Sequence, residues 1–161
     1  MELVRRTPTA FLGFHLYRTS GRGSYVADVE IEPSSEQSRV LVIDDDELIS
    51  DTLFRHLVSR GVATDLAIDA TTAEQLLLAN EYAVVLMDAY LSGQLHARAT
   101  ALVDRVRTLR PDSHIVVLTA YLSEQLAETV AKHARMTVVA KPKSISYLSR
   151  VIDDLLVAPT A

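Results

Sequence analysis

The sequence predicts an α/β domain built on a doubly wound, five-stranded parallel sheet. Two observations lead to this fold class. Short apolar runs rich in β-branched residues alternate with longer segments whose apolar residues recur at helical spacing. The runs are apolar throughout, which is typical of strands that helices cover on both faces of a parallel sheet. Right-handed crossovers between such strands give a three-layer sandwich.

Five strands are expected, at residues 40–43, 63–68, 83–87, 114–118 and 137–140. In the first helix, Ile49, Leu53 and Leu57 recur every four residues, and Gly61 stands where a C-terminal cap is expected. Thr72 is the expected N-cap of the second helix.

The last three helices are also delimited by sequence signals. Pro111 ends the third helix, and Ser123 caps a fourth that is expected to reach about Arg135. The fifth helix carries apolar residues on one face, namely Ile145, Leu148, Ile152 and Leu155.

The chain divides near residue 38 into an N-terminal extension, residues 1–38, and a domain, residues 39–157. Two runs with alternating polarity flank a glycine-bearing turn at residues 20–23, so the extension is a candidate β-hairpin, with an unstructured leader as the alternative. A lone hairpin is marginally stable in water, so it would pack on the domain or on a second copy of the chain. If it mediates a homodimer, deletion of residues 1–36 gives a monomer by light scattering.

Composition excludes several classes of protein. The chain has 161 residues, no cysteine and a formal net charge of −5, so disulfide frameworks, thiol catalysis and non-specific nucleic-acid binding are not expected. Its apolar runs are too short to cross a bilayer, and the stretch after Arg5-Arg6 is a poor signal peptide. The expectation is a soluble cytoplasmic protein with no nucleic-acid or membrane partner.

Functional side chains gather at the predicted strand ends. Asp44, Asp45 and Asp46 follow the first strand, and Asp88 follows the third; Thr119 and Lys141 follow the fourth and fifth. In doubly wound sheets, ligands bind beyond the carboxyl ends of the strands.

Clustered carboxylates repel one another, by about 4 kcal/mol for two charges about 4 Å apart at an effective dielectric constant of about 20. A hard dication relieves this repulsion, and Mg²⁺ suits an all-oxygen site. The cation and Lys141 could together hold a phosphoryl group, and one carboxylate could act as a nucleophile that forms an acyl phosphate.

Four segments in this order resemble the receiver domain of two-component response regulators. They are Val40-Leu41-Val42-Ile43-Asp44-Asp45-Asp46, Tyr82 to Asp88 with Leu91-Ser92-Gly93, Val116-Val117-Leu118-Thr119-Ala120, and Val138-Val139-Ala140-Lys141-Pro142. The resemblance covers residues 39–157 and implies a flavodoxin-like (βα)5 fold.

The resemblance also implies roles for individual residues. Asp88 would be the phosphoacceptor, and Thr119 and Lys141 would hold phosphoryl oxygens. Mg²⁺ would be bound by Asp44, Asp45, Asp88 and the main-chain carbonyl of Tyr90. The Lys141–Pro142 bond is expected to be cis, while Asp46 and Glu47 are expected to begin the first helix.

The resemblance further implies a histidine kinase or histidine phosphotransfer protein as donor. The chain would be a stand-alone response regulator that signals through contacts with an unknown downstream protein, and it would not be a turnover enzyme. Val138 stands where the family usually has an aromatic residue that reports phosphorylation, so we expect an unusual or weakened read-out. Tyr90 and Tyr121 would flank the phosphoryl group and obstruct an attacking water, which predicts slow self-dephosphorylation.

Two alternatives remain open. A receiver-like module that binds partners without phosphorylation would keep the fold and lose the chemistry, and Val138 favours it mildly. A haloacid-dehalogenase-like phosphatase would use Asp44, Asp46, Thr119 and Lys141. That family also needs a late acidic pair at a strand end, whereas Asp153-Asp154 lie in a predicted helix.

Overall fold

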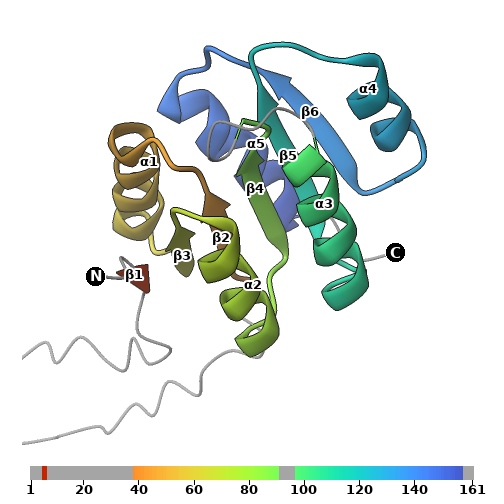
Figure 1. The fold of residues 1–161 in the computed structure, drawn as a ribbon. Coiled ribbons are helices and arrows are strands. Elements are labelled where there is room, and N and C mark those ends of the chain that lie inside the picture. The colour runs from red at the N-terminus through yellow and green to blue at the C-terminus, as the bar shows by residue number, and fades with distance from the viewer. Residues whose placement is uncertain (1–4, 7–37, 91–96, 158–161) are drawn as a thin grey trace, which may run out of the picture.

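A computed structural model describes residues 5–6, 38–90 and 97–157 of the chain. The sheet has six strands in the order β1-β3-β2-β4-β5-β6 (Figure 1). The strands are β1 (Arg5–Arg6), β2 (Val40–Ile43), β3 (Thr64–Ala67), β4 (Val84–Asp88), β5 (His114–Thr119) and β6 (Met136–Ala140). Strands β2 to β6 pair in parallel, which confirms the predicted five-stranded doubly wound sheet.

Helices cover both faces of the sheet (Figure 1). They are α1 (Glu47–Ser59), α2 (Ala70–Ala79), α3 (Ala97–Leu109), α4 (Glu124–Ala131) and α5 (Ile145–Val157). One core cluster joins the sheet to α2, α3 and α4, and the other joins it to α1 and α5. Leu41 and Ile43 contribute to the first cluster, whereas Val40 and Val42 contribute to the second. This alternation along a strand explains why the strands are apolar throughout.

Most predicted helix ends agree with the structure. Asp46 is the N-cap of α1, and its side chain accepts hydrogen bonds from the backbone N–H groups of Leu48 and Ile49. Gly61 has φ +82° after α1, a left-handed conformation that favours glycine. Ser123 caps α4, as predicted, but this helix ends at Ala131 rather than near Arg135.

One predicted helix cap was wrong. The N-cap of α2 is Asp69, whose carboxylate accepts a hydrogen bond from the backbone N–H of Thr72. Thr72 therefore lies in the first turn, three residues after the cap. On α1, Leu53 and Leu57 are buried together with Ser50, whereas Ile49 is 37% exposed.

The N-terminal extension contributes β1, a strand that the sequence did not predict. It pairs antiparallel with β3. The predicted hairpin lies outside the described residues. Among the residues that the structure does describe, no helix is both long and apolar enough to span a membrane.

A buried polar cluster lies beneath α2, at the sheet edge where the parallel strands begin. Asp65, on β3, is fully buried, and its Oδ2 accepts hydrogen bonds from the Tyr82 hydroxyl at 2.7 Å and from Arg39 Nη1 at 3.1 Å. Asn80 donates to the Tyr82 oxygen in turn. Burial raises the pKa of Tyr82, and the hydrogen bond to Asp65 raises it further, so its hydroxyl stays a donor. The charge of Asp65 is thus partly compensated inside the core.

Candidate functional site

Three carboxylates meet at the edge of the sheet where the parallel strands end. Asp44 directly follows β2, and Asp88 is the last residue of β4. Because Ile43 lies opposite Met87 in these neighbouring strands, the two aspartates leave the sheet side by side. Asp45 comes next in the chain, and one carboxylate oxygen from each of the three residues lies within 4.8 Å of the others.

The three carboxylates differ in their surroundings. Asp44 and Asp88 are 1% and 7% exposed, whereas Asp45 faces solvent. Asp44 Oδ1 accepts a hydrogen bond of 2.9 Å from the Asp46 backbone N–H. Burial raises the pKa of Asp44 above its ordinary value of 3.8; the Asp46 hydrogen bond and Lys141 lower it, and the charge of Asp88 raises it again. Burial prevails, so ionised Asp44 is held at a cost in free energy.

Lys141 brings a positive charge to the carboxylates. Its Nζ lies 3.0 Å from Asp88 Oδ2 and 3.6 Å from Asp44 Oδ2. Burial lowers the pKa of Lys141, but the hydrogen bond to Asp88 and the charges of Asp44 and Asp88 raise it by more. The ammonium therefore stays protonated at neutral pH. The Lys141–Pro142 peptide bond is cis, as the sequence predicted.

Thr119 ends β5, the strand next to β4, and is 6% exposed. Its hydroxyl donates to the Tyr121 carbonyl oxygen at 2.7 Å and accepts from the Tyr121 backbone N–H at 3.2 Å. A hydroxyl has one proton to donate. The Thr119 hydroxyl is therefore engaged with its own loop in this structure and not with the carboxylates.

The two tyrosines singled out in the sequence belong to loops that leave this edge of the sheet. Tyr90 follows Asp88 by two residues, and its backbone N–H donates to Asp88 Oδ1 at 3.2 Å. Its side chain is 50% exposed, and that of Tyr121 is 71% exposed. The Tyr90 ring is thus half exposed, and the Tyr121 ring presents most of its surface to solvent or to a partner. Residues 91–96, which follow Tyr90, lie outside the described part of the chain.

The donor set fits a hard divalent cation. All three clustered side chains are carboxylates, and Mg²⁺ prefers oxygen ligands. Because Asp45 is exposed, water has access to the group, and Mg²⁺ usually keeps several waters. The buried charge of Asp44 and Asp88 exceeds what Lys141 alone can balance, which favours a further cation.

One contributor to the site was not identified from the sequence. The Asp46 backbone N–H fixes Asp44 Oδ1, while the Asp46 side chain caps α1. The sequence did carry a signal, because aspartate commonly accepts a hydrogen bond from the backbone two residues later. Asp46 therefore both begins the helix and orients a carboxylate of the site.

The structure does not support the acidic pair that a haloacid-dehalogenase-like phosphatase needs. Asp153 and Asp154 lie within α5, and Asp153 forms an ion pair of 2.8 Å with Arg60. They follow no strand and do not belong to the carboxylate group, so the structure gives no support to the phosphatase alternative.

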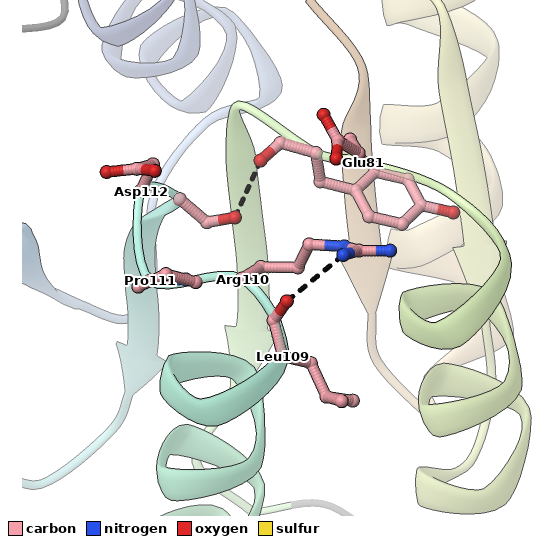
Figure 2. Close-up of a pocket in the computed structure, with 7 residues that line it drawn as sticks. Glu81, Leu109, Arg110, Pro111 and Asp112 are labelled. Atoms are coloured by element: carbon pink, nitrogen blue, oxygen red, sulfur yellow. Dashed lines mark hydrogen bonds between the residues drawn. The ribbon is translucent and has the colours of Figure 1, made fainter.

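A pocket lies at the opposite edge of the sheet, between the segments that lead into β4 and β5. Figure 2 shows the side chains that line it, with the Ser113 hydroxyl donating to the Tyr82 carbonyl oxygen and Arg110 donating to the carbonyl oxygen of Leu109. Glu81 and Asp112 belong to the same rim. Because this pocket is at the amino ends of the strands, it is separate from the carboxylate group.

Comparison with known proteins agrees with this geometry. Residues 40–153 match the family model described as the response regulator receiver domain. No curated protein matches the chain in sequence.

Solved structures show the same fold. A CheY-like receiver domain protein from Methanospirillum hungatei is 22% identical, with a TM-score of 0.67 over 75% of this chain and 94% of that one. A response regulator from Burkholderia pseudomallei, solved with a phosphorylated aspartic acid, calcium ion and citrate, is 29% identical, with a TM-score of 0.60 over 73% and 72%. TrrA from Thermotoga maritima, in complex with Mg²⁺-BeF, is 24% identical, with a TM-score of 0.59 over 73% and 98%.

Proposed function

The chain belongs to the response regulator receiver domain family, and we propose that it accepts a phosphoryl group on Asp88 from a phosphohistidine donor. The observation that carries this proposal is the contact of Lys141 Nζ with Asp88 inside the group of three carboxylates. That contact places a cation beside the carboxylate that ends a central strand. Phosphoryl transfer depends mainly on such positioning and on charge stabilisation.

In the proposed step, a carboxylate oxygen of Asp88 attacks phosphorus. The bond from phosphorus to the donor imidazole nitrogen breaks as the bond to Asp88 forms, and the product is an acyl phosphate. Lys141 then pairs with a phosphoryl oxygen in place of the free carboxylate. Thr119 donates its hydroxyl proton to another phosphoryl oxygen, and for that it must release the Tyr121 carbonyl oxygen.

Asp44, Asp45, Asp88 and the main-chain carbonyl of Tyr90 are the proposed Mg²⁺ ligands. When bound, Mg²⁺ would neutralise charge on the transferring group. The Asp46 N–H holds Asp44 in place for this role.

The proposed donor is a histidine kinase or a histidine phosphotransfer protein, and the proposed target is a protein that recognises the phosphorylated form. In this scheme the chain is a stoichiometric phosphoacceptor and not a turnover enzyme. Residues 39–157 form the receiver domain of the proposal, and residues 1–38 are an extension to it.

The direct test is intact-mass analysis after incubation with acetyl phosphate and Mg²⁺. We expect one phosphoryl adduct that disappears in Asp88→Asn. Asp46→Asn is the matched control, because it changes the net charge equally and asparagine is as good an N-cap as aspartate. An adduct that persists in Asp88→Asn would transfer the role to another aspartate, with Asp44 the next to test.

A second candidate function is binding without phosphorylation. It is favoured by Val138, an aliphatic, half-buried residue on β6 that packs against the core. The same experiment separates the two functions, because a module that only binds partners forms no Mg²⁺-dependent adduct in either protein.

A further inference from the structure

The outer edge of β3 is occupied by the N-terminal strand of the chain. Of the five parallel strands, β3 is the last on one side of the sheet, and β1 lies beside it (Figure 1). All four residues of β3 are buried. The edge of the receiver sheet is therefore covered on this side, and β1 supplies the neighbouring main chain.

The main chain of β3 has groups that need a partner at this edge. The carbonyl oxygens of Ala63 and Ala67 accept from the N–H groups of Val40 and Asp44 at 2.9 and 3.1 Å, so their main chain faces β2. Main-chain direction alternates along a strand, so the groups of Thr64 and Leu66 face the opposite side. Both residues are buried, and buried main-chain groups require hydrogen-bond partners.

The strand register shows which residue of β1 lies opposite the outward-facing main-chain groups of β3. Arg5 lies opposite Leu66, and Arg6 lies opposite Asp65. Since the main chain of Leu66 faces β1, Arg5 and Leu66 form the hydrogen-bonded pair of this antiparallel ladder. Arg6 is in the alternate position, so its N–H points away from β3.

We propose that this pairing acts as a clasp within one chain, held by main-chain hydrogen bonds between Arg5 and Leu66, and that it closes the β3 edge to strands of other molecules. Two residues make too few contacts to bind from solution, so the strand depends on its tether to the domain. Residues 7–39 separate β1 from β2, a span of at most about 120 Å when fully extended, which is long enough for β1 to reach β3. Charge also favours the dibasic strand, because residues 39–161 hold twelve basic and sixteen acidic residues.

The clasp gives the N-terminal extension a defined attachment point. An open edge strand can pair with the edge of another chain, and a covered one cannot. The clasp therefore prevents another strand from pairing with β3. Because the contact is made by main-chain groups, no side-chain pattern in the sequence predicts it.

Proline substitution tests the clasp in the full-length chain. Arg5→Pro removes the N–H that faces Leu66 and should lower the hydrogen-exchange protection of the Leu66 amide at least tenfold. Arg6→Pro is the matched control, because it removes an N–H that faces away from β3, a position where edge strands tolerate proline. The Leu86 amide in β4 serves as an internal reference and should stay protected in both variants.

Three outcomes would overturn the proposal. Unchanged Leu66 protection in Arg5→Pro would show that β1 does not hold this edge. Equal losses in Arg5→Pro and Arg6→Pro would contradict the proposed pairing. Wild-type protection that rises with protein concentration would show that the strand comes from a second copy, whereas protection that is independent of concentration supports a clasp within one chain.

Discussion

Asp44→Asn should stabilise the metal-free protein, although it removes a negative charge from the proposed Mg²⁺ site. Asp44 is 1% exposed and shares its surroundings with Asp45 and Asp88. The substitution replaces a buried charge with a neutral group of the same shape. An asparagine oxygen can still accept the hydrogen bond that the Asp46 N–H makes to Asp44.

The magnitude follows from the distances at the site. With oxygens of Asp44 and Asp88 within 4.8 Å, their repulsion is at least about 3.5 kcal/mol at an effective dielectric constant of about 20. The attraction to Lys141 Nζ at 3.6 Å is about 4.6 kcal/mol on the same scale, so the two nearly cancel. The desolvation of the carboxylate remains, at several kcal/mol. Allowing for the smaller desolvation of the amide, we expect a gain of about 2 kcal/mol, or about 4–8 °C in Tm.

The raised pKa of Asp44 determines how the stability difference between Asp44→Asn and the wild type changes with pH. The pKa of Asp44 is raised above 3.8 in the folded protein, so between these two values the folded state binds more protons than the unfolded state. Wild-type stability from this group is therefore greatest at low pH and is lost as pH rises through the folded pKa. The advantage of Asp44→Asn should grow over that interval and then level off.

Urea unfolding in EDTA and in Mg²⁺ measures both effects. In EDTA, Asp44→Asn should be more stable than the wild type; at a Mg²⁺ concentration about 100 times Kd, the wild type should gain about 2.7 kcal/mol and the variant little. Asp46→Asn, with the same change in charge, should stay within about 0.5 kcal/mol of the wild type in EDTA. A loss of stability in metal-free Asp44→Asn would refute the reasoning, because it would mean that the ion pair with Lys141 outweighs desolvation.

Three further predictions concern other residues. Tyr82→Phe removes a donor from buried Asp65 and should lower the free energy of unfolding in urea by about 1.5–3 kcal/mol, whereas Tyr147→Phe, at a half-exposed ring, should not. Lys141→Met should reduce the initial rate of adduct formation from acetyl phosphate by about 10–100-fold, the equivalent of one charge-assisted hydrogen bond. A rate equal to that of the wild type would show that Lys141 takes no part in the proposed step. Phosphorylated wild type should persist well beyond minutes in a mass time course if the Tyr90 ring obstructs an attacking water, as the sequence predicts; Tyr90→Asn should then shorten that lifetime several-fold.

Local sequence patterns were enough to predict the parallel sheet and the convergence of its strand ends. Burial on both faces of the sheet accounts for the apolar runs. Because β2 and β4 are parallel neighbours, Asp44 and Asp88 lie at the same edge of the sheet for any loop conformation. The errors occurred where two residues could satisfy the same rule. Asp69 and Thr72 are both good N-caps, and the structure uses Asp69.

The features that local sequence patterns did not predict depend on tertiary contacts. Ile49 shares the four-residue spacing of Leu53 and Leu57, yet on α1 it is 37% exposed and Ser50 is buried. The strand β1 has no apolar pattern, since its pairing depends on main-chain groups of β3. The Asp65 cluster joins residues from three segments, so no single window of sequence contains it.

The contacts of Thr119 indicate where the structure would first respond to the proposed phosphorylation of Asp88. Its one hydroxyl proton is bound to the Tyr121 carbonyl oxygen at 2.7 Å, so donation to a phosphoryl oxygen must break that bond. The loop that follows carries Tyr121 and Leu122, 71% and 52% exposed, and leads directly into the Ser123 cap of α4. Val138 on β6 has no hydroxyl and no ring whose rotation could report the change. We therefore expect the first structural response to phosphorylation in the loop at residues 120–122 and at the start of α4, and not in β6.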